Sequence, residues 1–149
     1  MTERLLQYIW QFQYFNKTSL QTVEGETVEI VYQGSYNTNQ GPDFLEAKLK
    51  IGNTLLVGNV ELHCKTSEWN THKHSADKNY ANVIAHIVWE NDCTLPNNLP
   101  TIILQDRVSK ILLEKYQKLL NTSSFIPCEN SISTVPEITW LSWKERLLI

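Results

Sequence analysis

This chain of 149 residues has few cysteines, glycines and prolines, and it has no basic block. Its three widely spaced cysteines form neither a disulfide framework nor a CxxC zinc motif, and reduced thiols are typical of a cytoplasmic protein. The five glycines and five prolines exclude collagen and long flexible linkers. The net charge of −3 disfavours a large nucleic-acid-binding face. No apolar run approaches the roughly 18 residues of a membrane helix, so we expect no membrane partner.

The hydrophobic pattern predicts an α/β fold, with helices flanking a mixed sheet that has an antiparallel hairpin at its centre. Residues 44–51 alternate in polarity, Gly52 and Asn53 are typical of a hairpin turn, and residues 55–65 form the return strand. Further strands are expected at 27–33, 82–89 and 101–105. Helices are expected at 2–15, near 75–81 and at 107–120. The last helix should turn its apolar residues inward: Val108, Ile111, Leu112, Tyr116, Leu119 and Leu120.

The register of the hairpin decides which side chains share a face. A two-residue turn would pair Ile51 with Thr54 and turn Asp43 away from Glu61. A three-residue turn pairs Ile51 with Leu55 and keeps six apolar residues together on one face, namely Leu45, Ala47, Leu49, Ile51, Leu55 and Val57. We therefore expect the three-residue turn, which places four candidate site residues on one side: Asp43, Glu61, His63 and Lys65.

The C-terminal residues 140–149 begin a second amphipathic helix and stop without a C-cap. We expect an α/β domain over 1–130, followed by a helical segment over 131–149 that is cut from a longer protein. Its apolar side chains, among them Trp140, Trp143 and Leu147, should be exposed and should mediate self-association through residues 140–149.

Two carboxylates lie on neighbouring predicted strands. Asp43 follows Gly41 and Pro42, and Glu61-Leu62-His63 comes eighteen residues later. This arrangement resembles the PD-(D/E)xK nuclease superfamily, with His63 at the usual lysine position. The resemblance implies a restriction-endonuclease-like core that hydrolyses phosphodiester bonds of nucleic acid. It also implies that Asp43 and Glu61 bind Mg²⁺ or Mn²⁺, while His63 and Lys65 position the nucleophile.

A longer resemblance rests on residues 39–44, 58–63 and 82–86, and it spans most of the chain. These segments are similar to an uncharacterised bacterial family known only as a domain of unknown function. The nuclease superfamily also places a carboxylate on its first helix, and Glu3 would be that residue here. By contrast, Glu46 and Lys48 match the acid-x-Lys pattern but are interpreted as part of a solvated stripe.

Two other functions remain open. The first is a non-catalytic interaction module on the same fold, favoured by the missing lysine and the acidic net charge. The second is a zinc site made by His63, His72 and His74, with Cys64 or Asp77. His86 alternates with apolar residues and is interpreted as a core histidine, and three aromatic residues are interpreted as packing residues: Trp69, Tyr80 and Trp89.

Overall fold

The computed structural model describes residues 1–95, 98–121, 126 and 129–147. The contacts within the chain divide it into two compact units, Met1–Ser109 and Lys110–Ile149. The predicted division at residue 130 stays a prediction, and the last two residues of the predicted segment 131–149 lie outside the described residues. Among the described residues, no helix has the length and apolar character needed to cross a membrane.

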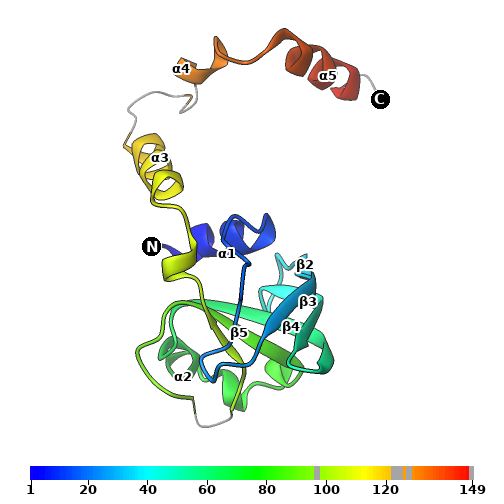
Figure 1. The fold of residues 1–149 in the computed structure, drawn as a ribbon, viewed down its shortest axis with the longest axis vertical. Coiled ribbons are helices and arrows are strands. Elements are labelled where there is room, and N and C mark those ends of the chain that lie inside the picture. Colours follow the sequence, from blue (N-terminus) through cyan, green and yellow to red (C-terminus); the bar gives the residue numbers. More distant parts are fainter. Residues whose placement is uncertain (96–97, 122–125, 127–128, 148–149) are drawn as a thin grey trace. The chain divides into compact units, whose positions relative to one another are not determined.

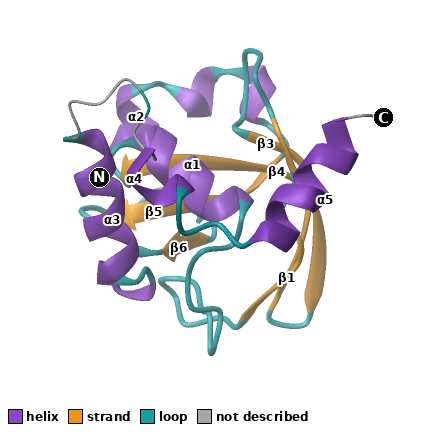
Figure 2. Cartoon of the chain, turned by 90° about the horizontal axis from the view of Figure 1, so that it is seen from above, coloured by secondary structure: helices purple, strands orange, loops and turns teal. Residues whose placement is uncertain are grey.

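The first unit is built on a six-stranded mixed sheet, drawn in orange in Figure 2. Antiparallel pairs join β3 to β1, β2 and β4, whereas β4, β5 and β6 are parallel neighbours. The α/β class and the hairpin within a mixed sheet are therefore confirmed. The strand bounds are β1 Val28–Tyr32, β2 Ser35–Tyr36, β3 Phe44–Ile51, β4 Thr54–Lys65, β5 Val83–Glu90 and β6 Thr101–Ile103.

Helix α1, Glu3–Gln11, packs on β4 over the sheet (Figure 1). It begins where the Thr2 side chain accepts a hydrogen bond from the Leu5 N–H, as an N-cap does. The helix ends earlier than predicted, because Gln13 adopts a left-handed φ of 53° that a helix cannot continue. Its inner face is fully in the core: Leu5, Leu6, Ile9 and Trp10 are buried.

The hairpin turn has two residues and not three, so the predicted register is wrong. Ile51 pairs with Thr54, and a β-bulge then interrupts the ladder between Phe44 and Ala47. Glu46, with a φ of 59°, supplies the bulge, and beyond it Phe44 lies opposite Val60. This one-residue shift places Asp43 level with Glu61 after all.

The same register corrects the predicted apolar face. Ala47, Leu49 and Ile51 are buried, but Leu55 and Val57 are 58% and 55% exposed. Pairing at Ile51 and Thr54 turns these two residues away from the core, and the bulge leaves Leu45 exposed as well. In the second half of β4 the residues of both faces are buried, which is why polar residues there lie inside the protein: Val60, Glu61, Leu62 and His63.

Short helical turns connect β4 to β5: α2 Glu68–Thr71, η1 His74–Ala76 and η2 Lys78–Tyr80. A further 3-10 turn, η3 Gln105–Arg107, follows β6. Gly58 makes the start of β5 possible, since a Cβ there would lie 2.5 Å from the Asn82 carbonyl oxygen. This close approach sets β5 beside the buried half of β4.

The second unit contains α3 Lys110–Leu120, α4 Glu129–Ile132 and α5 Glu137–Leu147. Val108, in the first unit, is buried as predicted, and no residue of α3 is buried within its own unit, so the inward face predicted for 107–120 stays a prediction. In α5, Trp143 and Leu147 are 46% and 85% exposed, as expected, whereas Trp140 is half-buried and its ring lies 5.3 Å from that of Trp143. Self-association through this helix stays a prediction.

Candidate functional site

Hydrogen bonds connect Asp43, just before β3, with Glu61 in β4. The Asp43 backbone N–H donates to Glu61 Oε2 at 3.0 Å, and the Leu62 N–H donates to Asp43 Oδ2 at 3.0 Å. Gln7 on α1 donates from Nε2 to Asp43 Oδ1 at 2.7 Å. The two carboxylates are thus brought together and oriented by backbone groups.

These acids lie in an environment that disfavours their charges. Burial raises the pKa of the Asp43 carboxyl to about 7, against the opposing effect of the Leu62 hydrogen bond. Burial and the Asp43 charge raise the pKa of the Glu61 carboxyl to about 9. Burial likewise raises the pKa of Glu3, whose own charge acts on both acids. A cation held here would offset three neighbouring carboxylates.

All four histidines of the chain meet beside Glu61. His63 on β4 is central, because its Nδ1 lies 2.8 Å from His86 Nε2 on the parallel strand β5. Its Nε2 lies 3.0 Å from His72 Nδ1 and 3.2 Å from His74 Nε2. The His86 ring, interpreted as a core histidine, is indeed fully buried, but its bond to His63 makes it part of this cluster.

Glu61 joins the carboxylates to the imidazoles. Its Oε1 lies 3.4 Å from His74 Nε2 and 3.6 Å from His63 Nε2. Burial lowers the pKa of His63 to about 2 and that of His86 to about 3, so both rings are neutral at physiological pH. Neutral imidazoles have free lone pairs, and the ligand atoms of His63, His72 and His74 all lie within 4.8 Å of one another. These three residues could hold a metal ion.

Aromatic side chains enclose the cluster. Trp69 is buried, its ring lies 5.2 Å from that of His74, and its Nε1 donates to Ser75 Oγ at 2.9 Å. The Tyr80 ring stacks on His74 at 3.8 Å. These contacts are consistent with the packing role predicted for both aromatic residues, and they also fix the orientation of a histidine.

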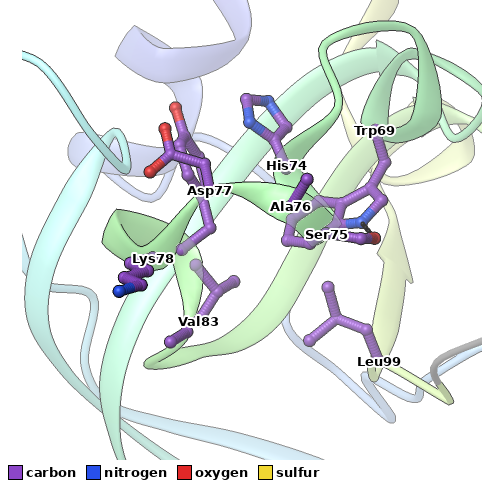
Figure 3. Close-up of a pocket in the computed structure, with 10 residues that line it drawn as sticks. Trp69, His74, Ser75, Ala76, Asp77, Lys78, Val83 and Leu99 are labelled. Atoms are coloured by element: carbon purple, nitrogen blue, oxygen red, sulfur yellow. Dashed lines mark hydrogen bonds between the residues drawn. The ribbon is translucent and has the colours of Figure 1, made fainter.

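A cavity of about 440 Å³ adjoins this side of the cluster. Figure 3 shows Trp69 and Leu99 on one side of it and Asp77 and Lys78 on the other. His74 also lines it, so the cavity gives solvent and small molecules an approach to the edge of the histidine cluster. Its lining combines apolar side chains with the carboxyl group of Asp77, the amine of Lys78 and the imidazole of His74.

The remaining sequence candidates lie further from this centre. Lys65 is exposed at the end of β4. Its charge acts on Asp92, whose pKa is lowered mainly by hydrogen bonds from Ser67 and in smaller part by Lys65. Cys64 points elsewhere and donates from Sγ to the Met1 carbonyl oxygen at 3.8 Å. Asp77 accepts a hydrogen bond from the Asn79 N–H as the N-cap of η2. The two residues considered as a fourth zinc ligand are thus engaged in other contacts.

Glu61 lies 3.4 Å from His74 and 3.6 Å from His63, and the sequence placed it beside His63 but did not connect it with His72 and His74. Gln7 was also missed, although it is one helical turn from Glu3 and holds Asp43. The only signal in the sequence for this assembly was the concentration of histidines between residues 63 and 86.

The comparisons with known proteins give a family but no activity. No curated protein and no solved structure shows a significant match to the chain. The restriction-endonuclease-like core therefore stays a prediction. A family model described as "Protein of unknown function (DUF2851)" matches residues 3–149, which is nearly the whole chain. The chain therefore belongs to the DUF2851 family.

Proposed function

We propose that this protein is a metal-dependent phosphodiester hydrolase of the nuclease type. One observation carries the proposal: half-buried Asp43, just before β3, and buried Glu61 on β4 are joined by hydrogen bonds through backbone N–H groups, with His63 two residues further on. Two unpaired carboxylates held so close repel each other, and a divalent cation relieves that repulsion. Their oxygens are the ligands that Mg²⁺ and Mn²⁺ prefer.

Each residue has a separate role in this proposal. Asp43 and Glu61 hold the cation, which would polarise the phosphate and lower the pKa of a water molecule. His63 is neutral because it is buried, so it orients the nucleophile without adding positive charge. Lys65, exposed at the end of β4, attracts the phosphate backbone at the rim of the site.

Nucleic acid is the proposed substrate. Lys65, Lys73 and Lys78 come from the strand end and the turns that adjoin the histidines, and Lys78 lines the neighbouring cavity. This local positive charge suits a polyanion even though the net charge of the chain is −3.

Cleavage of fluorescent DNA and RNA oligonucleotides in Mg²⁺ or Mn²⁺ tests the proposal. We expect the wild-type chain to cleave one of them and Asp43→Asn to fall to the rate of buffer and metal alone. Glu46→Gln is the matched control, since Glu46 is an exposed carboxylate of the same strand, and it should keep wild-type activity. Equal rates for Asp43→Asn and the wild type would refute the role of the carboxylate pair.

A non-catalytic interaction module on the same fold is the second candidate. It is favoured by His63, which replaces the positive charge of a lysine with a ring that stays neutral. Oligonucleotide binding without cleavage, retained in Asp43→Asn, would support this function instead.

A further inference from the structure

The three imidazoles and one carboxylate oxygen that converge beside β4 make a set of metal ligands of a different chemistry. His63 and His74 present Nε2, His72 presents Nδ1, and Glu61 presents Oε1. We infer that these four residues form a four-coordinate site for a transition-metal dication of the zinc type.

Four of the six distances between these atoms match a tetrahedral ligand shell, and the three nitrogens all lie within 4.8 Å of one another. Zinc bonds of about 2.0–2.1 Å to nitrogen or oxygen require ligand atoms about 3.3 Å apart in a tetrahedron. From His63 Nε2, the other nitrogens lie at 3.0 and 3.2 Å. From Glu61 Oε1, the nitrogens of His74 and His63 lie at 3.4 and 3.6 Å. These four distances lie within a few tenths of an ångström of the roughly 3.3 Å expected for ligand atoms in a tetrahedron.

Hydrogen bonding alone explains this convergence poorly. A neutral imidazole has one N–H, yet the two nitrogens of His63 face three other ring nitrogens. The single proton of His63 serves one of those contacts and its one lone pair accepts a proton from one partner ring, so one contact is left without a hydrogen bond. A cation shared by the lone pairs of His63, His72 and His74 satisfies the rest.

The surroundings resemble the outer shell of a metal centre. The second nitrogen of His63, Nδ1, lies 2.8 Å from His86 Nε2, and when Nδ1 donates in this hydrogen bond, Nε2 of His63 is free for a metal. Tyr80 and Trp69 pack on His74 and set its ring orientation. His72 is the exposed member and leaves a path by which an ion enters.

The donor types select the metal. Imidazole suits zinc, cobalt, nickel and copper, whereas Mg²⁺ prefers oxygen ligands and keeps several waters. Cys64, considered earlier as a ligand, contacts the Met1 carbonyl oxygen and does not belong to the set. The inference shares Glu61 and His63 with the proposed hydrolase but rests on the convergence of the imidazoles, so it holds even if the protein cleaves nothing.

Cobalt titration of the metal-stripped, untagged chain tests this inference. We expect one equivalent of Co²⁺ to produce the intense visible bands of tetrahedral cobalt, and one equivalent of Zn²⁺ to abolish them. His72→Ala, at an exposed position, should weaken cobalt binding by more than about tenfold. Cys64→Ser is the control and should bind as the wild type does.

Two results would overturn the inference: the pale spectrum of six-coordinate cobalt in the wild type, or unchanged affinity in His72→Ala. Circular dichroism of each variant shows that the fold is retained. Asp43→Asn separates the two proposals, because it should lose cleavage while keeping the cobalt spectrum. Loss of cleavage together with the spectrum would show that Asp43 belongs to this site too.

Discussion

Raising the pH should destabilise the metal-free protein, and Glu61 should account for most of the loss. A carboxyl whose pKa is higher in the folded state binds its proton more tightly there than in the unfolded chain. Stability is therefore lost as the pH rises from the unfolded pKa towards the folded one. For Glu61 this window runs from 4.5 to about 9, and for Asp43 from 3.8 to about 7.

The buried histidines act in the opposite direction. The pKa of His63 falls from 6.5 to about 2 and that of His86 from 6.5 to about 3, so stability is lost as the pH falls below 6.5. Between pH 4.5 and 6.5 two carboxyls and two imidazoles nearly cancel, and we expect a broad maximum of stability there. Above pH 6.5 these histidines are neutral in both the folded and the unfolded state, so only the carboxyls change the stability.

The magnitude follows from the width of the upper window. One pKa unit corresponds to about 1.4 kcal/mol, and Glu61 titrates over about 2.5 units between pH 6.5 and its folded pKa. The free energy of unfolding should thus fall by roughly 3 kcal/mol from pH 6.5 to 9, with a smaller share from Asp43. Glu61→Gln carries no titrating carboxyl at this position and should lose less than about 1 kcal/mol.

Urea unfolding in EDTA, at several pH values, measures these differences. Glu46→Gln serves as the control and should follow the wild-type curve, because Glu46 is exposed. A wild-type stability that stays flat or rises between pH 6.5 and 9 would refute the argument from buried acids. Saturating Zn²⁺ should reverse the slope, since the ion binds the ionised carboxylate and neutral imidazoles.

Three further comparisons test how the fold positions the site. Gly58→Ala should destabilise the protein by about 1–3 kcal/mol, because its Cβ would meet the Asn82 carbonyl oxygen at 2.5 Å; an unchanged denaturation midpoint would contradict this close approach. Glu46→Gly should raise the melting temperature by removing left-handed strain, a gain of up to about 1 kcal/mol, and a lower melting temperature would argue against the bulge. Trp10→Ala should cost about 3–5 kcal/mol in urea unfolding, and Val57→Ala should change stability by less than about 0.5 kcal/mol because its side chain is exposed; similar losses would refute the burial pattern.

The sequence by itself determined the local elements. Alternating polarity over 44–51 and the turn at Gly52 specify the hairpin, because a strand presents every second residue to the core. The amphipathic period of the first helix likewise specified the face with Leu6 and Trp10. Asp43 and Glu61 were expected side by side, and they are, but for a different reason from the one predicted.

The tertiary structure decided the register. A tight two-residue turn alone would have turned Asp43 away from Glu61, and the bulge at Glu46 restores the match. A glutamate with a positive φ leaves no recognisable signal in a sequence, because the surrounding packing imposes that conformation. Likewise, the amphipathic pattern of α3 indicates an apolar face but does not identify the partner that covers it.

The histidine cluster also depended on tertiary structure. His86 lies in an apolar run, so its sequence context indicated burial but no partner. Parallel pairing of β4 with β5 brings it to His63, and the turns after β4 return His72 and His74 to the same place. Such contacts join separate strands and turns, and local periodicity contains no information about them.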